Sequence, residues 1–199
     1  MSLRVIAAVA AGVIYGFSQS GRLPPAALSL VETVALAVVL FSAGVEMGRQ
    51  WRRIVVILRR GWVTFATPIA VVVGTLLGGI LAAVTARIGV AEALAISGSF
   101  GWYSLAGVVL TSAAGPTVGA LGFLANVLRE VTAMTLIPLL TRRLGRESAV
   151  AAAGATAMDT SLGILVRYGG VRSGSIGLVS GVLLSALAPL FLAFFSVRL

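Results

Sequence analysis

The sequence contains no cysteine and no histidine, and it has a single aspartate, Asp159. The absence of cysteine excludes a disulfide framework, a cysteine-ligated metal and a thiol nucleophile. The absence of histidine excludes serine–histidine catalytic arrangements, the HExxH zinc site and a histidine proton shuttle. One aspartate cannot supply the paired aspartates of an intramembrane protease within one chain. We therefore predict that the protein is not an enzyme and that it holds neither a metal nor a cofactor.

Charged residues are also scarce. Only 11% of the 199 residues are charged and 59% are hydrophobic, and the mean hydropathy is +1.08. A soluble domain carries about 25% charged residues, so this composition does not fit a water-soluble globule. All 15 basic residues are arginine, and the net charge is +9. Because the arginines lie between apolar runs, we interpret them as topology signals of a membrane protein and not as a nucleic-acid-binding surface.

Long apolar runs divide the chain. A helix needs about 20 apolar residues to cross a bilayer. The first run could also be a signal peptide, but no small-residue cleavage pattern follows it, so we expect a retained helix. The sequence predicts an all-α polytopic membrane protein that forms one domain over 1–199. Five spanning helices are expected, at 3–20, 25–47, 61–86, 116–141 and 173–196.

The arginines predict the orientation of these helices. The segments 48–61 and 141–147 are rich in arginine, which places both on the cytoplasmic side. Two helices precede the first segment, so the N-terminus is expected in the cytoplasm as well. An even number of crossings must lie between the two segments, and the helices at 61–86 and 116–141 already supply two. The apolar stretch near 90–114 must therefore make no net crossing.

Glycines and serines interrupt this apolar stretch around Gly98. Irregular backbone at membrane depth persists only where it is buried in protein or lines a wet cavity. We favour a re-entrant segment here over an ordinary helix packed through small residues. The spacing of Gly98 and Gly107 recurs in Gly154 and Gly163, which predicts a second broken segment near 148–168 that enters from the opposite side. Such an inverted pair is typical of secondary transporters; if both segments cross, the chain has seven spans.

Glu130 is the acidic residue expected deepest in the membrane, near the middle of a spanning helix. Asn126 precedes it by one helical turn and shares its face, and Arg129 is its neighbour. Each charge at the bilayer centre costs at least about 2.5–3.5 kcal/mol. The sequence allows either a structural Arg129–Glu130 pair or an ion and substrate site, and we favour the site.

Asp159 lies inside the second broken segment, next to the hydroxyls of Thr156 and Thr160. A carboxylate among hydroxyls and open backbone groups suits a cation or an ammonium group. The alternative is a helix N-cap, for which aspartate is favoured. Since histidine is absent, proton coupling must use carboxylates or tyrosine, and Glu130 and Asp159 are the expected pair.

The first broken segment carries further candidate binding residues. Aromatic faces attract an ammonium group with about 0.5–2 kcal/mol, although plain packing of the rings explains them equally well. The candidates are Ser99, Trp102, Tyr103 and Ser104.

Four ordered motifs resemble one known family. The segments 101–107, 123–130, 136–140 and 154–160 are together similar to the lysine exporter family known as LysO. The resemblance implies export of L-lysine, and of toxic analogues such as thialysine, from the cytoplasm across the plasma membrane. It also implies proton antiport, with intramembrane acidic residues at Glu130 and Asp159.

The chain departs from the family in two ways. Family members often have proline where this chain has Gly163. They also carry additional N-terminal helices, so we expect a small membrane subunit or a homodimer to complete the assembly. Alternative functions are export of another cationic amino acid, a diamine or Na⁺, or an accessory subunit that transports nothing.

Zwitterionic lysine presents two ammonium groups and one carboxylate, and each unpaired charge is costly in a low dielectric. We predict that Asp159 binds one ammonium group. Glu130 then exchanges a proton or binds the second ammonium group, and Arg129 or a half-helix N-terminus binds the carboxylate.

Overall fold

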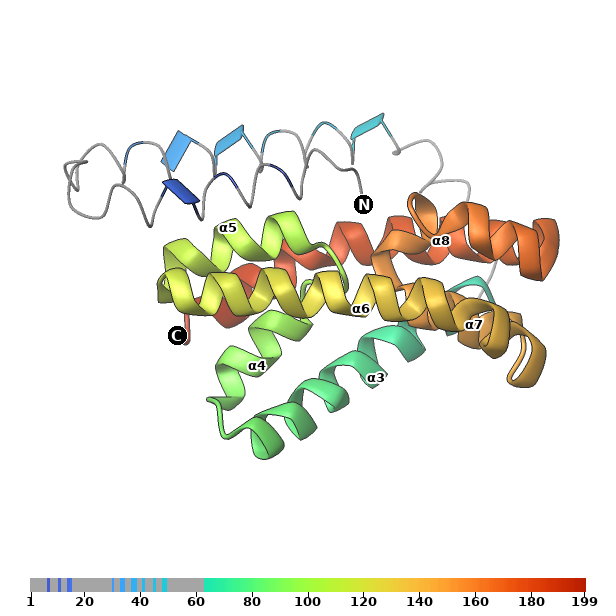
Figure 1. Ribbon diagram of the computed structural model, residues 1–199, viewed down its shortest axis with the longest axis horizontal. Coiled ribbons are helices and arrows are strands. Elements are labelled where there is room, and N and C mark those ends of the chain that lie inside the picture. Colours follow the sequence, from blue (N-terminus) through green and yellow to red (C-terminus); the bar gives the residue numbers. More distant parts are fainter. Residues whose placement is uncertain are drawn as a thin grey trace. The chain divides into compact units, whose positions relative to one another are not determined.

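The computed structural model describes residues 63–199, together with helical positions 7, 11, 14–15, 30, 33–34, 37–38, 41, 45 and 48–49. The chain divides into two units, Met1–Val38 and Val39–Leu199. The predicted helices at 3–20 and 25–47 and the loop 48–61 lie mostly outside the described residues. The fold reported below is that of residues 63–199, in which every regular element is a helix (Figure 1).

The first two helices of this part are α3 (Val63–Ala86) and α4 (Val90–Ser97). At 1.5 Å per residue, the 24 residues of α3 extend over about 36 Å, enough to cross a bilayer. The chain then turns at Arg87, whose φ is +54°. Helix α4 carries Glu92 in its first turn, where the helix dipole stabilises a negatively charged carboxylate.

Helices α5 (Tyr103–Ala114) and α6 (Pro116–Arg143) follow a break at residues 98–102. Gly115, with φ +89°, turns the chain between them, and proline starts α6 at the position where its missing N–H costs nothing. A side chain on Gly119 would lie 2.8 Å from the carbonyl oxygen of Gly107. Small residues therefore bring α5 and α6 close together.

Helix α7 (Arg146–Ala153), the short 3₁₀ helix η1 (Gly154–Met158) and α8 (Leu162–Ser196) complete the chain. Helix α8 is interrupted by Gly170, whose φ is +75°, and it therefore consists of a 162–169 arm and a 171–196 arm. A side chain on Gly174 would contact Val166, and one on Gly181, further along the chain, would contact Met158, which lies further back. The two arms therefore run antiparallel and reverse direction at Gly170.

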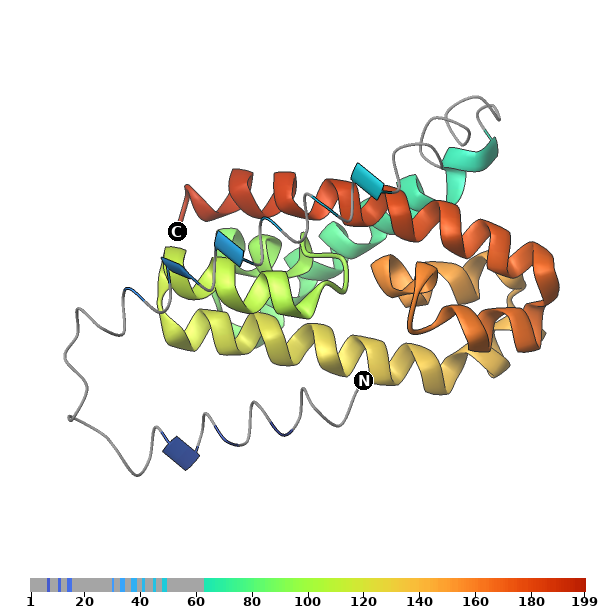
Figure 2. The same cartoon turned by 90° about the horizontal axis from the view of Figure 1, so that it is seen from above.

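The chain thus contains two helical hairpins with broken tips. Residues 98–102 form the first break, and residues 154–161 form the second break. In Figures 1 and 2 the α4–α5 hairpin and the α7–α8 turn lie toward opposite ends of α6. The tips meet, because the Ala155 N–H donates a hydrogen bond of 2.9 Å to the Phe100 carbonyl. The helical backbone is interrupted within both stretches, 90–114 and 148–168, and their re-entrant, opposed arrangement stays a prediction.

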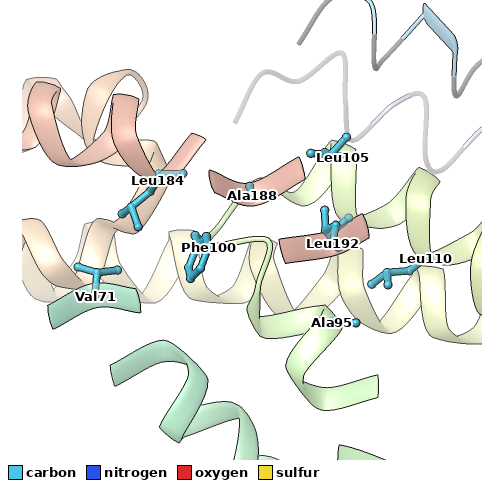
Figure 3. Packing of buried hydrophobic residues seen from close by; sticks show 10 residues of the cluster. Val71, Ala95, Phe100, Leu105, Leu110, Leu184, Ala188 and Leu192 are labelled. Carbon is cyan, nitrogen blue, oxygen red and sulfur yellow. The ribbon is translucent and has the colours of Figure 1, made fainter. Parts of the chain in front are cut away.

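A buried hydrophobic cluster anchors the first break (Figure 3). The Phe100 ring is fully buried and meets the Phe191 ring edge-on at a centroid distance of 5.1 Å. Leu184, Ala188 and Leu192 of the 171–196 arm belong to the same cluster. The tip of the first hairpin is therefore fixed against the last helix of the chain.

Three helices of the described part are long and apolar enough to cross a membrane. Two of them correspond to the predicted spans at 61–86 and 116–141, and the third contains the span predicted at 173–196. Large apolar side chains remain exposed along them, including Leu77, Leu124 and Leu128, as expected for surfaces that contact lipid. The regular structure of residues 63–199 is therefore all helical, with helices suited to a membrane protein. The number of five spans stays a prediction, because two of the helices lie outside the described residues.

Candidate functional site

The side chain of Asn126, in the long helix α6, is hydrogen-bonded to the backbone of the first break. Its side chain is 4% exposed, and its Oδ1 accepts a 2.9 Å hydrogen bond from the Gly101 N–H. Its Nδ2 donates to the Gly122 carbonyl at 2.8 Å and to the Ile96 carbonyl at 3.4 Å. Backbone groups freed by a break need partners where water is absent. The predicted site residue Asn126 therefore supports the broken backbone directly.

Glu130 lies one turn further along the same face of α6. Its side chain is 2% exposed, and neither carboxylate oxygen has a hydrogen-bond partner among the described residues. A buried carboxylate without a partner is strongly unfavourable. The hydrogen-bonded Arg129–Glu130 pair that the sequence allowed is therefore not formed, and Glu130 is left available for a ligand or a proton.

Two further ionisable side chains lie close to Glu130. Tyr103, the first residue of α5, and Asp159, in the second break, are both near enough to interact electrostatically with the Glu130 carboxylate. The three side chains come from α6 and from the two breaks. Tyr103 therefore interacts electrostatically with Glu130 and Asp159, the two acids that the sequence analysis selected as a pair.

Asp159 is exposed and is oriented by its neighbour. Its Oδ1 accepts hydrogen bonds from the Thr160 N–H at 2.5 Å and from the Thr160 hydroxyl at 3.3 Å. The N-cap position of α8 belongs to Ser161. Asp159 is therefore not the N-cap that the sequence analysis considered as an alternative.

The remaining hydroxyls of the second break bond within it. The Thr156 hydroxyl donates to the Ala153 carbonyl at 2.9 Å and lies 3.0 Å from the Ser161 hydroxyl. Both side chains are buried. In this structure Thr156 stabilises the turn, and its predicted role in binding stays a prediction.

The first break uses its polar residues in different ways. The buried Ser99 hydroxyl donates to the Ile96 carbonyl at 2.6 Å, and Trp102 occupies the N-cap position of α5. The Tyr103 ring packs edge-on against Phe123 at 5.6 Å. Ser104 is exposed, and its hydroxyl has no hydrogen bond within the described part. Of these four residues, Tyr103 is the one that the structure places beside the acidic groups.

Arg129 faces a different space from Glu130. It lines a cavity of about 290 Å³ together with residues of α3, α4 and α7, and the described residues give its guanidinium neither a hydrogen bond nor an ion pair. A side chain on Gly154 would meet this guanidinium at 2.6 Å, so Arg129 lies directly over the backbone of the second break. The cavity residues are Gly74, Thr75, Ile96, Ser97, Ala125, Asn126, Arg129 and Ala152.

The sequence analysis missed several polar residues of this region. Ser97 lines the cavity, and its position before Gly98 in an apolar run could have indicated it. Thr75 also lines the cavity, but nothing distinguishes it within the apolar sequence of α3. Ser173 and Ser180 are buried with unpartnered hydroxyls, and only the small-residue pattern of α8 marks them.

Comparison with known proteins identifies relatives of this sequence. The family model of the lysine exporter LysO matches residues 6–196. The lysine exporter LysO of Escherichia coli (strain K12) is 36% identical over 197 residues, which is 98% of this chain and 64% of that protein. A putative lysine exporter of Haemophilus influenzae is 39% identical over 122 residues, 61% of this chain and 62% of that protein.

The chain spans less than two thirds of the length of these curated relatives. No solved structure matches the chain.

Proposed function

Because the chain belongs to the lysine exporter family, we propose that it forms the membrane-embedded core of a transporter that exports L-lysine from the cytoplasm. The family is one of membrane transporters and not of enzymes. One observation carries the proposal for the site. Glu130 is buried with both carboxylate oxygens unpartnered, where the two breaks bring Asp159 and Tyr103 close to it.

Proton antiport is the proposed source of energy. A coupling site must hold either a cation or a proton in turn, and an acidic side chain without a permanent partner can do both. Glu130 and Asp159 are the two acids in this position, and the chain has no histidine. In this proposal Asp159 binds an ammonium group of lysine, or of an analogue such as thialysine. Glu130 exchanges a proton or binds the second ammonium group.

The two hairpins are proposed to enter the plasma membrane from opposite sides. The junction of α6 and α7 carries Arg142, Arg143 and Arg146, which supports a cytoplasmic location and, by helix count, a cytoplasmic N-terminus. Since the chain has no native cysteine, single cysteines at Thr117 and Leu144 can report the two sides. An impermeant thiol reagent should label Thr117→Cys in intact cells and Leu144→Cys only after permeabilisation. Labelling of both from outside would overturn this orientation.

The decisive experiment measures lysine-driven proton movement in proteoliposomes that contain an internal pH indicator. Glu130→Gln keeps the shape of the side chain but cannot exchange a proton, so coupled transport should fall to the background of protein-free vesicles. Glu147→Gln is the matched control, because Glu147 is an exposed acid in the first turn of α7. Normal proton movement in the Glu130→Gln vesicles would show that the proton role is wrong.

A second candidate function is that of a non-transporting accessory subunit. In this arrangement a small membrane subunit or a second copy of this chain is proposed to complete the transporter. Reconstitution of the chain alone and with a co-purified partner distinguishes these arrangements. If the same vesicles transport another cationic amino acid, a diamine or Na⁺ in place of lysine, that compound is the substrate.

A further inference from the structure

The cavity beside Arg129 has a composition that the acidic site does not explain. Its lining comes from α3, α4, α6 and α7, and it includes the hydroxyl residues Thr75 and Ser97. Arg129 is the only charged residue among those that line it. A guanidinium presents five N–H donors in a fixed plane, and the described part of the chain occupies none of them. The cavity therefore offers unused donors that fit a planar anion such as a carboxylate.

The ends of two short helices complete the lining. Helix α4 ends at Ser97 and helix α7 ends at Ala153, and the last turns of both contribute Ile96, Ser97 and Ala152 to the cavity wall. The C-terminal end of a helix carries a partial negative charge, which attracts cations. A carboxylate on Arg129 and an ammonium group beside these helix ends would both be compensated. That pair of groups is the head group of an α-amino acid.

Glu130 is directed away from this cavity. Successive residues of an α-helix are rotated by about 100°, and Glu130 is absent from the cavity lining while it lies near Tyr103 and Asp159. Asn126 contacts both regions: it lines the cavity, and it accepts a hydrogen bond from the backbone of the first break. Arg129 therefore lines the cavity, whereas Glu130 lies outside its lining, and Asn126 adjoins both.

We propose, on the basis of the export function proposed above, that this cavity binds the α-carboxylate and α-ammonium groups of the substrate, with Arg129 holding the carboxylate. Glu130 and Asp159 are then left for the cationic side chain and the proton. The substrate class follows: α-amino acids with a cationic side chain bind, and diamines without a carboxylate bind weakly.

The test is a binding measurement by calorimetry on the full chain in lipid nanodiscs, with lysine, lysine methyl ester and cadaverine as ligands. The wild-type protein should bind lysine at least about tenfold more tightly than either of the other two, since a hydrogen-bonded ionic contact contributes a factor of about 10–100. Arg129→Gln should lose that factor for lysine and leave cadaverine affinity unchanged. Arg129→Lys keeps the charge without the planar pair of donors and should fall between them. Arg143→Gln, an exposed arginine of the same helix, should bind all three as the wild type does.

The outcomes separate the two proposals. Unchanged lysine affinity in Arg129→Gln, or an equal loss for lysine and cadaverine, overturns the assignment of the cavity, because the second result indicates a general structural role. Equal binding of lysine and its methyl ester by the wild type overturns the assignment without any variant. A wild-type protein that binds and transports no lysine overturns the export function itself.

Discussion

The two breaks share their glycine spacing but are held in different ways. The first is attached by hydrogen bonds to a side chain of a spanning helix, Asn126. The second is packed against glycines of the 171–196 arm: a side chain on Gly181 would lie 2.8 Å from the Ala155 carbonyl, and one on Gly177 would lie 2.9 Å from the Ala157 carbonyl. The first break is buried, whereas Asp159 in the second is exposed.

This difference assigns the two breaks different roles: the first stabilises the fold, and the second presents a side chain that can react or bind. A break that is fixed by a buried polar side chain can carry an aromatic turn such as Phe100 within the core. A break that is held by close backbone packing leaves the acidic side chain of Asp159 exposed. The comparison predicts that the first break depends on one amide side chain and the second on the absence of side chains opposite it.

The largest effect is expected for Gly181→Ala. The added methyl group would meet the Met158 backbone nitrogen at 2.7 Å, and overpacking of this kind costs about 1–3 kcal/mol; backbone atoms cannot rotate away, so we expect the upper end. Thermal unfolding in detergent measures the change. Gly163→Ala is the matched control, because nothing lies within 4 Å of a side chain there. If both variants unfold at the same temperature, close packing does not hold the second break.

Asn126→Ala should have the next largest effect. It leaves the buried Gly101 N–H without a partner, which costs about 1–3 kcal/mol, and part of the loss should be recovered by relaxation of the turn. The midpoint of thermal unfolding should fall, while Thr135→Ala should change it little, since the Thr135 hydroxyl is exposed and bonds within α6. An unchanged midpoint for Asn126→Ala would remove the distinction between the breaks.

A smaller effect is expected for Thr156→Val. This change keeps the shape of the side chain and removes the hydrogen bonds to Ala153 and Ser161, with a net cost of about 0.5–1.5 kcal/mol. Stability should fall by less than in Gly181→Ala. The reverse order would mean that hydroxyls, and not glycine packing, stabilise the second break.

Asp159→Asn should change stability least. The side chain is exposed and its hydrogen bonds run to the adjacent Thr160, so the free energy of unfolding should stay within about 0.5 kcal/mol of wild type. Lysine transport in proteoliposomes should nevertheless be lost under the proposed function. A variant that transports normally would show that the exposed acid of the second break is dispensable.

Much of the described fold could be predicted from the sequence. Apolar length predicted α3 and α6, and the arginine distribution together with glycine spacing predicted breaks near Gly98 and Gly154. These features are local, because hydropathy and backbone freedom act on a few adjacent residues. The reversal at Gly170 lies between the broken segment predicted near 148–168 and the span predicted at 173–196. The residue itself was not singled out, since one glycine in an apolar run does not distinguish a turn from a packing contact.

The sequence selected the residues of the candidate site, whose role in binding stays a prediction, and it indicated their arrangement less well. Burial of Glu130 follows from the cost of a charge in an apolar helix, and the sequence selected it. The sequence could not tell whether Arg129 would pair with its neighbour or lie over Gly154, because that choice depends on the second hairpin, which is distant along the chain. The contribution of α3 to the cavity wall could not be predicted for the same reason, because Thr75 becomes a lining residue only through its contacts with other helices.

The meeting of the two tips has a mechanical consequence. Within the described residues, the hydrogen bond from Ala155 to Phe100 is the only backbone bond that joins one tip to the other, and the net contribution of such a bond is about 0.5–1.5 kcal/mol. Thermal motion supplies that amount readily. This bond alone therefore does not lock the tips together. Phe100 and Ala155 also belong to one buried hydrophobic cluster, so a relative movement of the tips would also disturb that packing.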